Sequence, residues 1–287
     1  MKIFFTRILY ISLIINSLIA VASAQSWRDN TAELVYMPRY FGPNAFPIVD
    51  LHSGAVGSRW ELEVRGEMHR YTGDDTRDIY ARLYIPVVKE RVAVELCGVV
   101  VEDYVMTPET RDERHAVETE SPITCYGDLI VNTFFQLIRS ESLFDLMVDM
   151  HLKTASGSRL CDARYTDAAS YGFNITIGRN IAQNASRTFA WRLQGMAGFY
   201  CWMTNDMVHR QNDAITYGAG TSLAYRNILL AVDYSGFNGY KNAGDRPAMI
   251  RTKFDFEYRK NIISLRYKHG VHDYLYDTYS IGYIRCF

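Results

Sequence analysis

Residues 276–287 read YDTYSIGYIRCF and set the interpretation of the rest of the chain. Their side chains alternate in character: Tyr279 and Ile281 fall on one parity, whereas Ser280 and Gly282 fall on the other. A period of two is the period of a β-strand, whose successive side chains point to opposite faces. One face of this closing strand is therefore apolar, and the other is small or polar.

A strand at the edge of an open sheet exposes a row of unpaired N–H and C=O groups. In a closed barrel the last strand pairs with the first, and no edge remains. We therefore expect an all-β fold, in which residues 58–287 form one antiparallel up-and-down barrel that crosses a membrane.

The same alternation recurs from Ser58 onward. In residues 59–69, RWELEVRGEMH, the apolar Leu62 and Val64 alternate with charged residues. A charged row opposite an apolar row indicates a sheet with water on one face and an oily environment on the other. Twelve segments show the pattern: 59–69, 78–87, 91–101, 127–137, 144–153, 171–178, 188–200, 214–225, 227–234, 249–259, 261–268 and 277–287.

The connections between these segments alternate in length. Those after the even-numbered strands are tight, as at Arg226-Asn227, whereas those after the odd-numbered strands are longer and polar, as at residues 71–78 and 104–125. Short periplasmic turns and long external loops are typical of outer-membrane barrels. Most strands span about nine to eleven residues, which suffices to cross a bilayer when tilted. A soluble β-sandwich, the other fold with alternating strands, needs only modest strand lengths. An even strand count predicts that both termini lie in the periplasm.

The closing strand has alternate apolar residues and an aromatic residue, Phe287, at its end. This stretch resembles the assembly signal of Gram-negative outer-membrane β-barrels. Arg285 departs from the family pattern, because it takes an outward position that is usually apolar. The resemblance covers about residues 58–287. It implies an outer-membrane location, contact with outer-membrane lipid, and recognition of the C-terminal strand by the barrel assembly machinery.

The N-terminus carries an export signal in the expected order. Lys2 and Arg7 flank a short apolar lead, a longer apolar run follows, and Ala22-Ser23-Ala24 forms an A-x-A cleavage site. We predict a signal peptide over residues 1–24. Residues 25–57 contain three prolines and read as an irregular lead-in, either a periplasmic extension or a plug tucked into the lumen.

Composition narrows the function classes further. No apolar run after the signal approaches the length of a transmembrane helix. Removal of Lys2 and Arg7 takes the formal charge from −1 to −3, so no nucleic-acid partner is expected. Five cysteines in an exported chain leave at least one thiol without an internal partner, and a disulfide between two of Cys125, Cys161 and Cys201 is plausible in an oxidising compartment.

If the apolar face meets lipid, the other face lines the lumen. Its cations and anions are nearly balanced in number, so net charge predicts no strong ion selectivity. The charges can form a paired network that fills the interior, or line a water-filled pore. The predicted lumen-lining residues are Arg59, Glu61, Glu63, Arg65, Glu67, Arg82, Glu95, Asp128, Arg192, Arg251, Lys253, Asp255, Glu257 and Arg266.

Twelve strands lie between the eight of a filled barrel and the sixteen of an aqueous channel. The lumen parity is nearly bare over residues 172–178 and 216–224, which leaves room for a solute or for the lead-in. We therefore predict a passive channel for small solutes. The alternatives are an outer-membrane hydrolase and a sealed structural or surface-interaction barrel.

The hydrolase alternative depends on Asp145, Asp149 and His151, which share one lumen stripe and offer an acid and a base. A carboxylate beside a histidine is half of a catalytic triad, but no serine stands out as the nucleophile. A hydrogen-bonded pair within the lumen network is the simpler explanation. No metal-ligand spacing recurs, so we expect neither a metal nor a cofactor.

Overall fold

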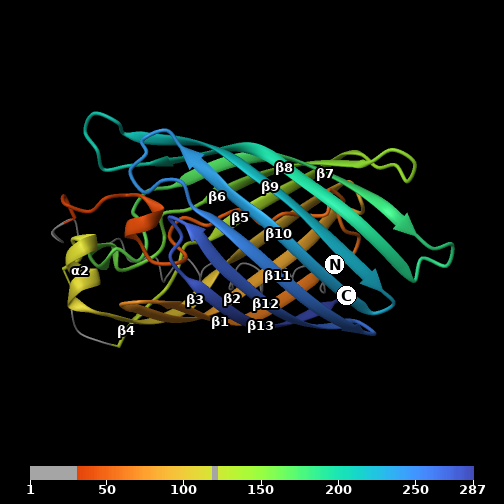
Figure 1. Ribbon diagram of the computed structural model, residues 1–287, viewed down its shortest axis with the longest axis horizontal. Helices are drawn as coiled ribbons and strands as arrows, with labels where there is room; N and C mark the ends of the chain where they lie inside the picture. Colours follow the sequence, from red (N-terminus) through yellow and green to blue (C-terminus); the bar gives the residue numbers. More distant parts are fainter. Residues whose placement is uncertain (1–30, 118–121) are drawn as a thin grey trace, which may run out of the picture.

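The computed structural model describes residues 31–117 and 122–287, so the predicted signal peptide lies outside the described residues. Twelve antiparallel strands form a closed barrel, in which β1 pairs with β13 (Figure 1). This confirms the predicted fold. An additional short strand, β4, lies outside the ring. Among the described residues it pairs with residues 102–104 of β3.

The strands are β1 (Glu61–Tyr71), β2 (Asp74–Val88), β3 (Val92–Met106), β4 (Ile123–Cys125), β5 (Ile130–Ile138), β6 (Asp145–Lys153), β7 (Ser170–Gln183), β8 (Phe189–Met203), β9 (Gln211–Tyr225), β10 (Ile228–Gly239), β11 (Ala248–Tyr258), β12 (Asn261–His272) and β13 (Asp277–Cys286). The helices are short: η1 (Pro38–Tyr40), α2 (Pro108–Arg114) and η2 (Leu160–Asp162). Among the described residues, no helix is long and apolar enough to cross a membrane.

Burial follows the predicted period of two. On β1, Leu62 and Val64 are 43% and 49% exposed, whereas Glu63 and Arg65 between them are 0% and 5% exposed. The apolar row therefore faces outward, and the charged row faces the lumen. This is the reverse of a soluble protein, in which the apolar row would be the buried one.

Two predictions about strand ends are wrong. The connection after the first strand is not an eight-residue loop but a two-residue turn, because Gly73 adopts φ +96° and lets β1 fold directly into β2. Strands β2, β3, β8 and β9 each span 15 residues, beyond the predicted nine to eleven. The extra residues continue the sheet toward the end that carries the long loops. At 74–77 and 211–213 they are polar, and polar residues next to a strand are typical of a loop.

The barrel has two distinct ends. We call the end with α2 and the long connections the loop end, and the end with the short connections, such as 226–227 and 259–260, the turn end (Figure 1). The C-terminal residue lies at the turn end, where the backbone N–H of Phe287 donates to the carbonyl of Trp60 at 3.0 Å.

Residues 31–47, the mouth segment, lie at the loop end. The Asn205 side chain, between β8 and β9, donates to the carbonyl of Leu34 at 2.8 Å. The backbone N–H of Gly42 donates to the carbonyl of Ala163 at 2.8 Å. The described part of the lead-in therefore starts among the long connections rather than at the turn end.

Residues 48–57, the lumen segment, run from the loop end to the turn end inside the barrel. Near the loop end Arg251 donates to the carbonyl of Val49 at 3.0 Å. Further along, Arg192 on β8 donates to the carbonyl of Ser53 at 2.8 Å, and the Gln136 side chain on β5 accepts from the N–H of Val56 at 2.6 Å. Figure 1 shows this segment as the orange trace between the strands.

The direction of the lumen segment alters the predicted topology. The barrel itself begins and ends at the turn end, as an even strand count requires. The lead-in, however, crosses the lumen before β1, so Thr31 lies at the loop end, where its carbonyl accepts from Asn205. The N-terminus itself lies outside the described residues, so the predicted side of the N-terminus stays a prediction.

The mouth segment anchors a buried aromatic cluster at the loop end. Phe46 packs edge-on against Trp202 with ring centroids 5.7 Å apart, and Trp202 packs against Tyr200 and Phe237 at 5.3 and 5.4 Å. The Trp202 indole N–H donates to the carbonyl of Tyr36 at 2.9 Å. These rings close the lumen at the loop end. The aromatic cluster consists of Tyr36, Phe41, Phe46, Tyr200, Trp202, Phe237, Tyr274 and Tyr276.

A Gly178→Ala variant tests how tightly the lumen segment packs on the wall. A Cβ at Gly178 would lie 1.9 Å from the Ser53 carbonyl oxygen, so either the segment or the strand must shift, and we expect a loss of about 1–3 kcal/mol. The control is Gly195→Ala, whose Cβ would meet no atom closer than 3.7 Å. The measurement is the temperature at which heat-modifiable gel mobility is lost. Equal transitions in the two variants would contradict the packing described here.

Candidate functional site

The lumen wall is a network of paired charges. Every predicted lumen-lining residue takes part in an ion pair with a described residue. Arg82 on β2 is central: its guanidinium contacts Glu61, Glu63 and Glu95 at 2.7, 2.8 and 3.0 Å. Glu63, which is fully buried, also receives Arg266 at 2.8 Å. The charges thus satisfy one another across β12, β1, β2 and β3.

The lumen segment lies over the other side of the interior, where β7, β8 and β9 carry small residues. Leu51 approaches Gly218 and Gly220, and Ser53 approaches Gly178. The space beside the small residues of β7 and β9 is therefore occupied by the chain's own lumen segment. The ion pairs around Arg82 occupy one side of the lumen, and this segment covers the other, where it also contacts the ion-paired Arg192.

A second network, the loop-end ion-pair network, ties the loops to the barrel. Arg164, in the loop between β6 and β7, is fully buried and contacts Asp74 and Glu102 at 2.6 and 2.7 Å. Arg114 of α2 also contacts Asp74, at 2.6 Å. Asn44 of the mouth segment donates to Glu102 at 2.9 Å. The network consists of Asn44, Asp74, Glu102, Arg114, Arg164, Tyr165 and Tyr276.

Arg164 keeps its charge despite complete burial. Burial alone acts to lower the pKa of its guanidinium, but the carboxylates of Asp74 and Glu102 outweigh this effect and hold the pKa well above its ordinary value. Burial likewise opposes the charge on Arg114, whose pKa is nevertheless raised, with Tyr276 and Asp74 as the main causes. The network is therefore ionic, and it joins the mouth segment, α2 and the two longest loops.

Replacement of Arg164 tests this network. An Arg164→Met variant leaves Asp74 and Glu102 buried with one cation fewer, so we expect a loss of about 3–5 kcal/mol. The matched control is Arg187→Met, because the Arg187–Glu141 pair is exposed and such pairs contribute about 1 kcal/mol or less. Thermal unfolding in detergent measures both variants. A transition of Arg164→Met equal to that of the control would show that the network does not stabilise the loop end.

One group of side chains has the composition of a metal site. Glu67, His69 and Asp78 each offer a ligand atom, and these atoms lie within 4.8 Å of one another. The Glu67 oxygens already contact Arg65 and Lys268, both at 3.0 Å. His69 Nε2 lies 2.8 Å from Asp78 Oδ2. Because both carboxylates already have positively charged or polar partners, we assign this group to the ion-pair network.

The hydrolase candidates do not assemble a catalytic pair in this structure. Asp145 is ion-paired with Arg192. Asp149 Oδ1 accepts from Asn174 at 2.8 Å, and neither ring nitrogen of His151 has a hydrogen-bond partner among the described residues. His151 instead packs against Tyr200, with ring centroids 5.3 Å apart. A histidine that no carboxylate orients lacks the arrangement that activates a nucleophile.

The cysteines form no disulfide of the expected kind. Cys125 and Cys201 are buried free thiols, and each possible pair among Cys125, Cys161 and Cys201 includes one of them. The Cys125 thiol donates to Glu102 Oε1 at 3.5 Å. The prediction of a loop disulfide is therefore wrong, because Cys125 lies on β4, Cys161 in η2 and Cys201 on β8.

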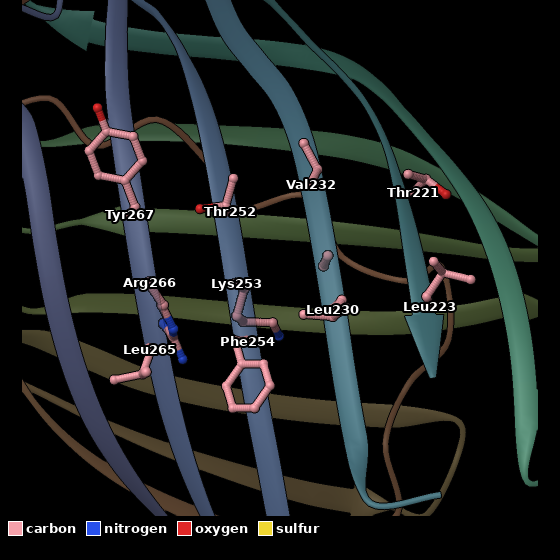
Figure 2. A pocket seen from close by; sticks show the side chains of 11 residues that line it. Thr221, Leu223, Leu230, Val232, Thr252, Lys253, Phe254, Leu265, Arg266 and Tyr267 are labelled. Atoms are coloured by element: carbon pink, nitrogen blue, oxygen red, sulfur yellow. The ribbon is translucent and has the colours of Figure 1, made fainter. Parts of the chain in front are cut away.

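A hollow of about 520 Å³ lies over β9, β10, β11 and β12 (Figure 2). Leu223, Leu230, Phe254 and Leu265 along its wall belong to the exposed apolar row. The hollow therefore opens on the outer face of the barrel, although Lys253 and Arg266 of the lumen face also contribute to its lining. Its mainly aliphatic and aromatic lining suits hydrocarbon rather than a polar solute.

Sequence reasoning placed the wall charges but missed the loop-end network. Arg114, Arg164 and Tyr276 come from three connections, and alternation carries no information about connections. One signal was present: Asp74 lies on the lumen parity of β2 at its loop end. Glu102 has the opposite parity from Glu95, and only a register shift between β2 and β3 turns it inward. Buried carboxylates need partners, and only loop residues lie within reach there.

Comparison with known proteins supports the fold alone. No protein-family model and no curated protein matches this sequence. An outer-membrane channel from Pseudomonas putida F1 is similar in structure, with a TM-score of 0.54 and 11% identity over 85% of this chain and 97% of that chain. The β domain of the Bordetella autotransporter BrkA has a TM-score of 0.48 and 9% identity, over 81% of this chain and 100% of that chain. The KdgM porin in complex with disordered oligogalacturonate has a TM-score of 0.47 and 11% identity, over 79% of this chain and 99% of that chain.

The first of these similarities shows that the chain has the fold of the outer-membrane β-barrels, as the closing strand predicted. The identities are too low to carry a solute, a substrate or a residue role from one protein to the other.

Proposed function

We propose that this chain is an outer-membrane channel for small solutes, closed by its own N-terminal segment. The observation that carries the proposal is the lumen segment, residues 48–57, which occupies the nearly bare side of an otherwise polar barrel. A polar wall suits passage of water-soluble molecules. The similar barrel from Pseudomonas putida is described as an outer-membrane channel, which supports the same class of function here.

The hold on the lumen segment is concentrated in a few side chains. Arg251, Arg192 and Gln136 donate to backbone carbonyls of the segment. Such contacts do not depend on the identity of the segment's side chains, and each is replaced by water when the segment moves. The segment is thus seated on the wall by these hydrogen bonds and by the ion pair between Asp50 and Arg251, and it is covalently continuous with the mouth segment on one side and with the chain that enters β1 on the other.

A hydrolase is the weaker proposal, because Asp149 and His151 form no hydrogen bond with each other. The sealed barrel is favoured by one observation, the aromatic cluster over the outer mouth. Conductance separates a sealed barrel from a channel that opens.

The channel proposal is tested by single-channel conductance in a planar bilayer. We expect rare current steps from the wild-type chain. In the Arg192→Ala, Arg251→Ala double variant, loss of charge-assisted hydrogen bonds should raise the open fraction by on the order of tenfold or more, since each is worth roughly 1.5–3 kcal/mol. Lys253→Met is the control, because Lys253 lies on the lumen face of β11 but pairs with Asp255. Silence from folded wild type and from the folded double variant would favour the sealed barrel.

The orientation is tested by labelling from outside the cell. If the loop end is external, an Ala32→Cys variant presents an exposed thiol at the outer mouth, and a membrane-impermeant maleimide should label it in intact cells. Asn227→Cys, in the exposed turn between β9 and β10, should react only after the outer membrane is opened. Wild-type protein sets the background from native thiols. The reverse pattern would invert the topology proposed here.

We also propose that the barrel assembly machinery recognises the closing strand. On β13 the outward residues Tyr279, Ile281 and Tyr283 are about half exposed, as is Phe287 at the end. This row is available to a partner before β13 pairs with β1.

A further inference from the structure

Asp149 is unusual among the carboxylates that face the lumen. Every other carboxylate that a barrel strand presents to the lumen has an Arg, Lys or His partner within 4.0 Å, whereas Asp149 has no ion pair with a described residue. Asp149 is nonetheless 2% exposed. A buried carboxylate without a counter-charge is strongly unfavourable, so the site calls for a cation.

One oxygen of Asp149 is already used, and the other is not. Oδ1 accepts from Asn174 Nδ2 at 2.8 Å, and Asn174 Oδ1 in turn accepts from Thr216 at 2.5 Å. This chain of hydrogen bonds crosses from β9 to β6 and fixes the carboxylate. Oδ2 is buried and has no hydrogen-bond partner among the described residues.

Further unpaired acceptors flank Asp149. His151 lies two residues along β6 on the same face, about 7 Å away, and both of its ring nitrogens lack a partner among the described residues. Thr176 Oγ1 on β7, fully buried, also lacks one. A carboxylate oxygen, an imidazole nitrogen and a hydroxyl can all accept hydrogen bonds. The ligand that fits such a set is a donor with a positive charge.

The surroundings distinguish an organic cation from a metal ion. Phe134 stands opposite Asp149 in the β5–β6 register and is 2% exposed, Met147 lies two residues along β6 on the same face, and Tyr200 packs on His151. Aromatic rings and methionine sulfur favour an alkylammonium group rather than a hydrated ion. The described metal-like grouping, moreover, lies at Glu67, His69 and Asp78 and not here.

We propose that these residues, the Asp149 cluster, bind a small organic cation with a primary ammonium group. The cluster consists of Phe134, Met147, Asp149, His151, Thr176 and Tyr200. The ammonium group donates to Asp149 Oδ2 and to one of the two acceptors that flank it, Thr176 beside Met147 or His151 on the other side, and its alkyl part contacts Phe134 and Met147. The inference rests on the proposed channel, because it assigns a solute class to the same lumen. His52 of the lumen segment packs edge-on against Phe134 at 4.9 Å, so the cation reaches the cluster as that segment moves.

The test measures binding to the full chain folded in detergent. The probe is n-butylammonium chloride, compared with tetramethylammonium chloride and sodium chloride at equal concentrations, because tetramethylammonium has the charge but no N–H donor. We expect butylammonium to raise the unfolding temperature in a saturable manner and the other two salts to raise it less. In Asp149→Asn, which preserves shape and the bond from Asn174, the apparent affinity should fall on the order of tenfold or more.

Two variants keep the test decisive. Asp255→Asn removes a lumen carboxylate that has its own cation, Lys253, and should retain the butylammonium response. If Asp149→Asn does not fold, Thr176→Val removes an unpaired acceptor and should weaken binding several-fold. Equal effects of the three salts on wild type, or an unchanged butylammonium response in Asp149→Asn, would overturn the proposal and indicate that Asp149 takes up a proton instead. Because binding is measured without ion current, specific binding by a chain that never conducts would refute the channel and leave the cation site standing.

Discussion

The fold depends on one constraint: within hydrocarbon, every backbone N–H and C=O must find a partner inside the protein. Pairing of β1 with β13 over ten residue pairs, from Glu61–Cys286 to Arg70–Asp277, satisfies this constraint at the only place where the sheet would otherwise have edges. Closure of the barrel then determines which side chains face outward and which face the lumen. The outer face must be apolar, and the charged alternate residues must turn inward, where no membrane lipid reaches them.

An interior of charges creates a second problem, which the chain solves in two ways. On the β12 to β3 side, carboxylates and guanidinium groups neutralise each other, as Arg82 does with three glutamates. On the β7 to β9 side, glycine and other small residues leave space, and the lumen segment fills it with its own backbone, bonded to Arg192 and Arg251. A backbone is a good filler here because its carbonyls match inward-pointing cationic donors.

The loop end is closed by two other kinds of interaction. The aromatic cluster excludes water through apolar contact, and the loop-end ion-pair network fixes the loops around it through buried charge. Asn44 and Phe46, only two residues apart in the mouth segment, take part in the network and the cluster respectively. Movement of the mouth segment would therefore disturb both, which links the loop end to the position of the lumen segment, the next residues of the chain.

The amino-acid sequence by itself determined the barrel, its strand count and the inward face of residues such as Glu63 and Arg266, because alternation along a strand is a local property. It did not determine the two-residue turn at Gly73, the position of Arg164, or the direction of residues 31–57. These features depend on contacts between residues that lie far apart in the sequence. Asp149 illustrates the division: its parity placed it in the lumen, but only the tertiary structure decided that its neighbours would be Asn174 and Phe134, with no ion pair to any described residue.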